Sequence, residues 1–305
     1  MTECFAKFRA PGVSEVCQTW YQVIGDLDDS SKTPLIIIHG GPGAGHEYLR
    51  PLNDLSPEIP LVFYDQIGCG RSTHLPDRAG DEKFWCMDLF IQELDNLLDH
   101  LKLQQRPIDI YGHSWGGILA ASWASRPSPP TRNLRRLVLS SSPASMSGFR
   151  ADLAMLRMQL PEDVQAVLNH ADETKDFMSP EYQDAIEVFY QRHLSLTRPW
   201  PPQEVQDMQK CLAMDMSSYL TMYGPNPLVI AGSLRDWTCV PSLHRIKVPT
   251  LLLDGSEDTV QDESVRPLFE HIEKVKWVTL DNAGHLAYVD QRVKYMKHLR
   301  AFLTA

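Results

Sequence analysis

Short apolar runs recur along the first half of the chain, and each is long enough for one strand of a buried sheet. They occur at 19–24, 34–39, 61–65, 108–111 and 136–140. Between the third and fourth runs, residues 84–103 show helical periodicity. Their apolar positions on one helix face are Trp85, Leu89, Leu94, Leu97, Leu98 and Leu101. Strands that alternate with helices predict an α/β fold, with a mostly parallel central sheet flanked by helices.

The pattern changes between residues 143 and 228, where the sequence shows no convincing strand. Helical segments in this stretch are interrupted by prolines, namely Pro161, Pro180, Pro199, Pro201 and Pro202. Strand runs return at 248–255 and 275–280, and an amphipathic helix follows. That helix is expected to bury Val289, Val293, Met296, Leu299 and Leu303. We therefore predict a core of residues 1–142 and 229–305, with an inserted helical cap at 143–228.

The predicted cap is rich in methionine and aromatic residues, including Met155, Met158, Met178, Met208, Met214, Met216, Met222, Tyr182, Phe189, Tyr190, Trp200, Tyr219 and Tyr223. Most of them are expected to fill the small core of the cap itself. Methionine also adapts to irregular apolar shapes and favours binding surfaces. We therefore expect some of these side chains to line a roomy apolar pocket.

The strand at 108–111 runs into Gly112-His113-Ser114-Trp115-Gly116, which has the G-x-S-x-G pattern of a nucleophile elbow. A serine at a sharp strand-to-helix turn needs strained backbone angles and glycine neighbours. The following residues, 117–124, have the composition of a helix whose N-terminal amides favour developing negative charge. We expect Ser114 to be a nucleophile; the alternative is a glycine-rich turn with an idle serine.

A second glycine-rich segment, His39-Gly40-Gly41-Pro42-Gly43, follows the strand at 34–39. Glycines let the backbone pass close to a ligand, and Pro42 stiffens the loop without adding a donor. The amides of Gly41 and Trp115 are the expected oxyanion donors. A phosphate loop is the alternative, but no Lys-Ser/Thr pair follows these glycines.

A nucleophilic serine needs a base, and the base needs an orienting acid. His285 follows the strand at 275–280 through a glycine-bearing loop, and Asp258 follows the strand at 248–255. Both lie just past the carboxyl ends of predicted parallel strands, where sites form on open α/β sheets. Asp254 and Glu257 are rival acids, but Asp254 still belongs to its strand and Glu257 comes one residue early.

Length and charge narrow the possible functions. A chain of 305 residues can bury one large core without disulfides. A net charge of −10 and a pI near 5.5 argue against nucleic-acid or anionic-membrane partners. The N-terminus lacks a signal-peptide stretch, and no run reaches transmembrane length. Neither a C-x-x-C pair nor a histidine cluster at zinc spacing occurs, so we expect no metal, no cofactor and a cytoplasmic protein with reduced thiols.

Three motifs together resemble the proline iminopeptidase family of α/β-hydrolases. They are His39-Gly40-Gly41-Pro42-Gly43, Tyr64-Asp65-Gln66-Ile67-Gly68-Cys69-Gly70-Arg71-Ser72 and Gly112-His113-Ser114-Trp115-Gly116-Gly117. Tyr223-Gly224-Pro225-Asn226 and Leu234-Arg235-Asp236-Trp237 are further similar to its tricorn-interacting aminopeptidase and amino-acid amidase branch. The resemblance extends over nearly the whole chain apart from a divergent cap.

The resemblance implies an α/β-hydrolase fold and assigns roles to individual residues. It implies Ser114 as nucleophile, Asp258 and His285 as its triad partners, and Gly41 and Trp115 as oxyanion donors. The segment 65–72 is expected to be structural, with Arg71 paired internally.

Two positions depart from the family where it recognises substrate. In the aminopeptidase branch, one acidic residue follows Gly-Pro-Asn and another follows the triad aspartate, and both hold the free α-ammonium of the substrate. Here these positions are Pro227 and Thr259, and Tyr223 is a further candidate substrate contact. A buried ammonium would lack its counter-charges, at a cost of several kcal/mol. Glu204, Asp207 or Asp215 could substitute.

The leading hypothesis is a serine hydrolase that cleaves an ester, amide or lactone of a small, fairly apolar substrate through an acyl-enzyme. The first alternative is a genuine proline iminopeptidase or amino-acid amidase with a relocated amine anchor. The second is a hydrolase-fold protein with a binding or non-hydrolytic role. The expected partner is a small molecule or a short peptide, without nucleic acid or membrane, and the oligomeric state stays open.

Overall fold

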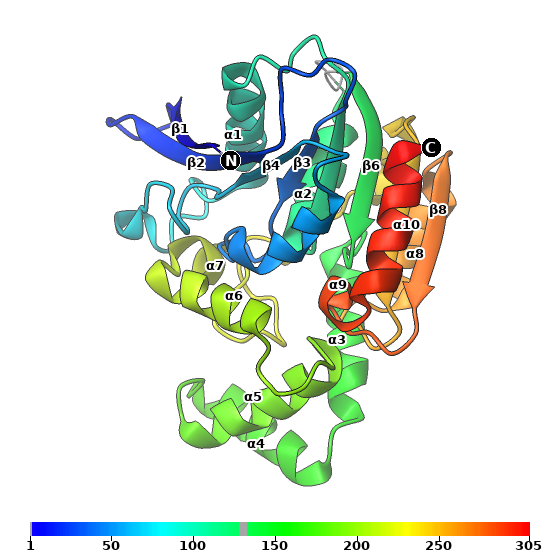
Figure 1. Ribbon diagram of the computed structural model, residues 1–305. Coiled ribbons are helices and arrows are strands. Elements are labelled where there is room, and N and C mark those ends of the chain that lie inside the picture. Colours follow the sequence, from blue (N-terminus) through cyan, green and yellow to red (C-terminus); the bar gives the residue numbers. More distant parts are fainter. Residues whose placement is uncertain (1, 128–132) are drawn as a thin grey trace.

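The computed structural model describes residues 2–127 and 133–305 (Figure 1). In this part of the chain eight strands form one sheet in the order β1-β2-β4-β3-β5-β6-β7-β8. β2 runs antiparallel to both of its neighbours, and every pair from β4 onward is parallel. The strands are β1 (Thr2–Phe8), β2 (Cys17–Ile24), β3 (Leu35–Ile38), β4 (Leu61–Tyr64), β5 (Ile108–His113), β6 (Leu134–Ser140), β7 (Thr250–Gly255) and β8 (Val275–Leu280).

This architecture confirms the predicted mostly parallel α/β sheet, and each predicted strand occurs within a few residues of its expected bounds. Strand β1 was not predicted. It lies at the edge of the sheet and pairs only with β2, and its Phe5 side chain is half exposed. A strand with little burial carries a weak apolar signal, so its short polar-apolar alternation did not stand out from the chain around it.

Successive residues of the central strands face opposite sides of the sheet, which produces two separate cores. Ile36 and Ile38 belong to the core that contains α1 (Met87–His100) and α2 (Trp115–Ala124). Leu35 and Ile37 belong to the other core, which packs against the 3-10 helix η1 (Glu47–Leu55) and the C-terminal helices. The strands are therefore buried on both faces, which explains why their sequences are continuous apolar runs.

The C-terminal segment forms two helices, α9 (Ala287–Asp290) and α10 (Arg292–Thr304), where one was predicted. Met296, Leu299 and Leu303 are buried as expected, but Val293 is 85% exposed, so its predicted burial was wrong. Gln291, at φ −125° and ψ 44°, breaks the helix and starts a new register. Val293 then lies roughly 100° around the helix from the centre of the buried stripe.

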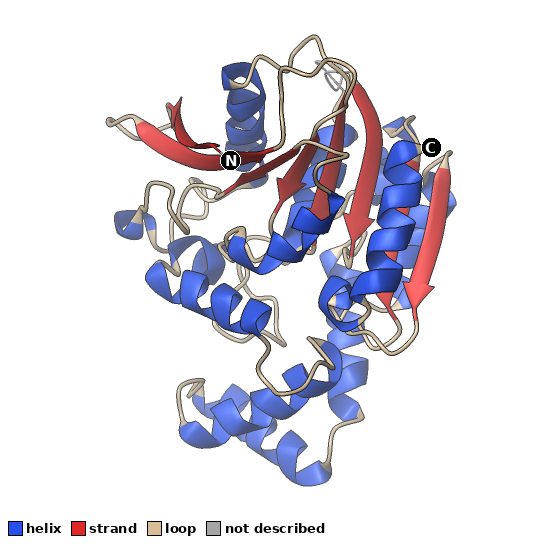
Figure 2. Cartoon of the chain, viewed as in Figure 1, coloured by secondary structure: helices blue, strands red, loops and turns tan. Residues whose placement is uncertain are grey.

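Five helices connect β6 to β7 and lie beyond the carboxyl ends of the strands, with α4 and α5 farthest from the sheet (Figures 1 and 2). They are α3 (Met146–Met158), α4 (Glu162–Thr174), α5 (Pro180–His193), α6 (Gln203–Met214) and α7 (Ser217–Met222). Three of the five prolines that interrupt the sequence pattern mark helix starts, whereas Pro199 and Pro201 lie between α5 and α6. Pro161 and Pro202 are N-cap residues, and Pro180 is the first residue of α5, where a missing N–H costs nothing.

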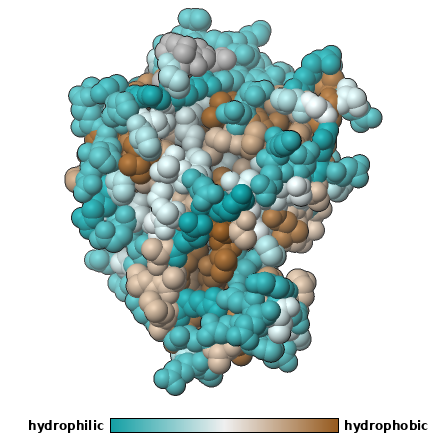
Figure 3. Space-filling model, turned by 180° about the vertical axis from the view of Figure 1, so that it is seen from behind, coloured by the Kyte–Doolittle hydropathy of each residue, from teal (hydrophilic) through white to brown (hydrophobic). Residues whose placement is uncertain are grey.

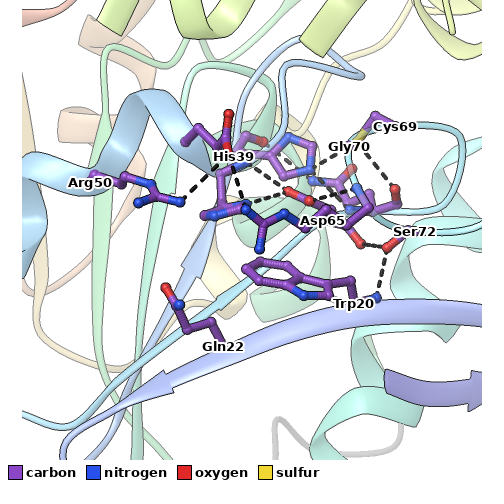
Figure 4. A network of polar contacts seen from close by, with 12 residues as sticks. Trp20, Gln22, His39, Arg50, Asp65, Cys69, Gly70 and Ser72 are labelled. Atoms are coloured by element: carbon purple, nitrogen blue, oxygen red, sulfur yellow. Dashed lines mark hydrogen bonds and ion pairs between the residues drawn. The ribbon is translucent and has the colours of Figure 1, made fainter. Parts of the chain in front are cut away.

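The loop after β4 is held by one buried carboxylate. Asp65 accepts hydrogen bonds from the amides of His46 and Arg71 and from His46 Nδ1 (Figure 4). Burial alone raises the pKa of Asp65, but these contacts outweigh it and hold the pKa below its ordinary value. The Arg71 guanidinium turns outward to Glu3 and Glu47, so it pairs within the protein as expected.

The remaining elements are the 3-10 turns η2 (Pro76–Arg78) and η3 (Val240–Arg245) and the helix α8 (Asp262–His271). All six cysteines fall within the described residues and are free thiols. Over residues 2–127 and 133–305, no helix combines the length and apolarity that crossing a bilayer requires.

Glu93 on α1 is fully buried and ties β2 to the loop after β4. Its Oε1 accepts hydrogen bonds from the Thr19 hydroxyl at 2.5 Å and from the Ile67 amide at 2.9 Å. Burial raises the pKa of Glu93 to about 8, although these hydrogen bonds oppose the shift. Between the unfolded pKa and about 8, the folded state holds a proton that the unfolded state releases.

The free energy of unfolding is therefore expected to fall as pH rises from about 4.5 to about 8, by at most about 1.4 kcal/mol per pH unit. Glu93→Gln keeps the acceptor oxygen and the side-chain size but cannot titrate, so its stability should lack this slope. Urea unfolding of both proteins at several pH values measures the difference. A wild-type minus variant difference that stays constant from pH 5 to 8 contradicts the prediction.

Candidate active site

The turn at Ser114 joins β5 to α2 and adopts φ 56° and ψ −121°, a strained conformation for a residue with a side chain. The glycines on either side make this turn possible. A Cβ on Gly112 would overlap the Gly116 carbonyl, and a Cβ on Gly116 would overlap the carbonyl of Ile38. The elbow therefore presents Ser114 at the carboxyl edge of the sheet, at the first turn of α2.

The first amides of α2 have no carbonyl partner within the helix, as in any helix N-terminus. Trp115 occupies the first helical position, directly after Ser114. The glycine-rich loop after β3 passes against the same serine, because a Cβ on Gly40 would lie 3.2 Å from Ser114 Cβ. Gly41 follows with φ 112°, which glycine adopts without steric cost. The two segments expected to supply oxyanion donors thus flank Ser114.

His285 and Asp258 are in contact. His285 Nδ1 lies 2.7 Å from Asp258 Oδ1, which also accepts the Val260 amide at 2.9 Å. Burial by itself raises the pKa of Asp258, but the charge and hydrogen bond of His285 outweigh it, so the pKa lies below its ordinary value. A carboxylate that stays ionised next to the ring fixes the proton of His285 on Nδ1 and leaves Nε2 free to accept one.

The rival acids point elsewhere. Asp254 Oδ2 accepts a hydrogen bond from Trp277 Nε1 at 2.7 Å, and burial raises the pKa of this carboxyl to about 7. The exposed Glu257 side chain accepts a hydrogen bond from Ser256, and its carbonyl lies 3.0 Å from the ring of His193. Of the three candidate acids, the structure brings only Asp258 to His285.

The three candidate substrate contacts have their own partners. The Thr259 hydroxyl lies 3.1 Å from His285 Nδ1 and 3.3 Å from Asp258 Oδ1, so it faces the acid-base pair. Tyr223 donates its hydroxyl proton to the Pro227 carbonyl at 2.9 Å, and its ring stacks on Tyr219. The two positions that are acidic in the aminopeptidase branch therefore offer no carboxylate here.

Sequence reasoning gave no role to Gln66, Tyr48 and His113. The Gln66 side chain accepts a hydrogen bond from Trp115 Nε1 at 2.9 Å and donates to the His39 carbonyl at 3.3 Å, so it joins the elbow to the glycine-rich loop. Tyr48 Oη accepts the Gly40 amide at 2.7 Å. Gln66 and His113 stand inside the motifs that carry the resemblance, but motif membership does not reveal these partners.

Helix α7 and the end of α6 lie over the glycine-rich loop. A Cβ on Gly43 would be 3.2 Å from Ser218 Oγ and 3.5 Å from Leu212 Cδ2. Farther out, α4 and α5 form a lobe at the bottom of the molecule, which we call the lower lobe (Figure 1). Seen from behind, apolar side chains gather in a hollow between this lobe and the rest of the molecule (Figure 3). The helical segment therefore contacts the loop beside Ser114 and borders an apolar hollow.

The arrangement offers a serine, an imidazole with a buried carboxylate, and backbone amides on both sides of the serine. Such a set can attack a carbonyl carbon and stabilise the resulting oxyanion. Among the described residues, no group of three or more His, Cys, Asp or Glu side chains is placed to hold a metal ion.

Comparisons with known proteins agree with this chemistry. Residues 33–291 match the family described as alpha/beta hydrolase fold. The chain is 33% identical over 290 residues to a proline iminopeptidase of Lactobacillus crispatus, covering 94% of both chains. It is 32% identical over 274 residues to one of Saccharolobus solfataricus, covering 90% of this chain and 85% of that one.

Two solved structures are similar over 99% of this chain and 98% of theirs. One is the crystal structure of VinJ, with a TM-score of 0.91 and 35% identity. The other is a proline iminopeptidase of Mycobacterium smegmatis, with a TM-score of 0.86 and 30% identity. The chain is therefore a serine hydrolase of the α/β-hydrolase superfamily and belongs to its proline iminopeptidase family.

Proposed function

We propose that the enzyme hydrolyses an ester, amide or lactone of a small, fairly apolar substrate through an acyl-enzyme on Ser114. The observation that carries this proposal is the strained Ser114 turn together with the 2.7 Å contact between His285 and Asp258. The His285 ring packs against His113, the residue before Ser114. Ser114 Oγ attacks the substrate carbonyl and loses its proton to His285 Nε2, while Asp258 stabilises the imidazolium. The amides of Gly41 and Trp115 bind the oxyanion.

The same groups complete the first half-reaction and then act on water in the second. His285 gives its proton to the leaving group, whose departure leaves the acyl group on Ser114. It then takes a proton from water, which attacks the acyl carbon, and Ser114 recovers its proton when it is released. The whole reaction consumes one water and needs no cofactor.

We further propose that residues 143–228 form a cap that shapes the substrate site. The contact of α6 and α7 with the glycine-rich loop supports this role, as does the apolar hollow bordered by the lower lobe. An enclosed apolar site excludes water and strengthens the electrostatic interactions of the triad. We also propose a cytoplasmic location, which the six free thiols support.

The enzyme is not expected to require a free α-amino group on its substrate. Pro227 cannot carry charge, and the Thr259 hydroxyl is turned to the acid-base pair. Of the acids that could replace the anchor, Asp215 accepts the Leu75 and Ser217 amides, and Asp207 accepts Gln203 Nε2. Release of N-terminal residues is the second candidate function, favoured by relatives named proline iminopeptidases over most of their length.

Removing any member of the proposed triad should abolish most activity. Ser114→Ala and His285→Ala remove the nucleophile and the base, and Asp258→Asn disturbs the histidine tautomer. We expect each to lower kcat by about 10³-fold or more, with combined effects far from additive. Steady-state kinetics on a chromogenic acyl ester measures kcat.

Asp254→Asn is the matched control, because it makes the same chemical change four residues away at a buried carboxylate that contacts Trp277. It should keep kcat within a few-fold of the wild type. Near-full activity in Asp258→Asn together with loss in Asp254→Asn would reverse the acid assignment. A phosphonate that labels a residue other than Ser114 would refute the nucleophile assignment.

The second prediction of the proposed function is indifference to the substrate amine. A charge-assisted hydrogen bond contributes about 1.5–3 kcal/mol, so losing a pair of them lowers preference for a free amine by roughly 10²-fold or more. Prolyl and alanyl arylamides should therefore show kcat/KM values no higher than those of their N-acetyl forms. Parallel measurement of both series, with amine-free acyl esters alongside, decides the point. A large preference for the free amine establishes the aminopeptidase function instead.

A further inference from the structure

A buried chain of hydrogen bonds runs from the glycine-rich loop to the loop that carries His285. The Gly40 amide lies 2.7 Å from Tyr48 Oη, which lies 3.0 Å from His113 Nδ1. On the other side of the same ring, His113 Nε2 lies 2.9 Å from the His285 carbonyl oxygen. This chain of hydrogen bonds therefore passes through His113, the residue next to Ser114. Both Tyr48 and His113 are 1% exposed.

The groups at the two ends of this hydrogen-bond chain, the Gly40 amide and the His285 carbonyl, set the direction of every hydrogen bond in it. The Gly40 amide can only donate, so Tyr48 Oη accepts there and has one proton left to donate. The His285 carbonyl can only accept, so His113 carries a proton on Nε2. A neutral ring then has a bare Nδ1, which accepts the Tyr48 proton. One arrangement of protons thus satisfies all four groups.

The surroundings keep the His113 ring in that neutral form. Burial and the neighbouring His285 lower the pKa of His113 to about 3, although the His285 carbonyl and Asp258 oppose the shift. The ring makes edge contacts with Tyr48, His285 and Tyr288, at centroid distances of 5.5, 4.8 and 5.4 Å. The aromatic neighbours hold the plane of the ring, and the hydrogen bonds set its rotation within that plane.

We propose that Tyr48 and His113 are positioning residues, which hold the Gly40–Gly41 backbone and the His285 loop at a set separation across Ser114. The inference rests on the proposed function, because it matters only if Gly41 supplies an oxyanion donor and His285 acts as base. Neither residue touches the reacting atoms. Their effect reaches the transition state through the placement of a donor amide on one side of Ser114 and a base on the other.

The His285 loop also makes hydrogen bonds that do not involve Tyr48 or His113. Ser141 Oγ also donates to the His285 carbonyl at 3.1 Å, and the His285 amide donates to the His193 carbonyl at 2.8 Å. These contacts preserve the fold of the loop when the Tyr48–His113 chain is broken. Loss of the chain should therefore shift the relative placement of catalytic groups more than it unfolds the protein.

The test begins with Tyr48→Phe, which removes one hydroxyl and leaves the ring. We expect kcat to fall about 10- to 100-fold, with KM within about twofold, because the lost geometry is needed in the transition state. Tyr295→Phe is the matched control. Its hydroxyl is equally buried and contacts Tyr111 and Ser140 rather than His113, so the same deletion should leave kcat within about threefold.

His113 provides a rescue experiment. His113→Gln keeps an amide donor that can reach the His285 carbonyl, whereas His113→Leu of similar size has none. Activity should fall in the order wild type, Gln, Leu. Adding Tyr48→Phe to His113→Leu should cost little more, since both changes break one chain. Equal kcat in the Gln and Leu variants, or a kcat for Tyr48→Phe equal to that of Tyr295→Phe, overturns the proposal.

Nitrogen NMR of the wild-type histidine side chains gives a readout that needs neither turnover nor a variant. His113 should be neutral and protonated on Nε2 throughout the pH range in which the enzyme is folded. A proton on Nδ1, or a charged ring near neutral pH, refutes the proton arrangement directly. This outcome is independent of the nucleophile assignment, which fails separately if Ser114→Ala remains active.

Discussion

The steric strain at Ser114 is the constraint on which the rest of the site depends. A side chain held at φ 56° costs on the order of 1–3 kcal/mol, so the surrounding structure must enforce it. It does so by close backbone packing on both sides of the turn. A Cβ on Gly117 would overlap the Ser142 side chain, whose hydroxyl donates to the Ser114 carbonyl at 3.1 Å. Gly116 and Gly117 are needed because the end of β3 and Ser142, which follows β6, pack against the turn.

The buried charge of Asp258 also depends on the groups packed around it. Asp258 is fully buried, and an isolated carboxylate there would be costly. The His285 ring, the Val260 amide and the Thr259 hydroxyl all converge on its Oδ1. A threonine at this position adds a neutral donor to the pair, whereas an acidic side chain would add a second negative charge beside Asp258. The threonine therefore changes the charge around the Asp258–His285 pair relative to the aminopeptidase branch.

The helical segment between β6 and β7 also supports the loop that carries His285. At the end of α5, the His193 and Leu194 carbonyls accept the amides of His285 and Leu286, both at 2.8 Å. Asp290 accepts the amides of Leu196 and Gly284 and so joins the two segments again. The position of His285 is therefore coupled to the helices beyond the carboxyl ends of the strands, and sequence changes in those helices can shift His285.

The sequence by itself determined the features that depend on neighbours in the chain. Apolar runs specify the buried strands, and the glycine pattern specifies the turn at Ser114. The order of strand and loop signals placed Asp258 and His285 at the carboxyl edge. The prediction from sequence failed in two places. The weak apolar signal of β1 was missed, and Val293, near the junction of two helices, was expected to be buried but is 85% exposed.

Only the tertiary structure decided which polar groups meet. Thr259 faces the acid-base pair, Gln66 joins two loops, and Tyr48 reaches His113 from a separate element. A hydrogen bond is short and directional, so its partner depends on the packing of segments far apart in sequence. Periodicity records which face of an element is buried. It carries no information about the atom that a buried donor will find there.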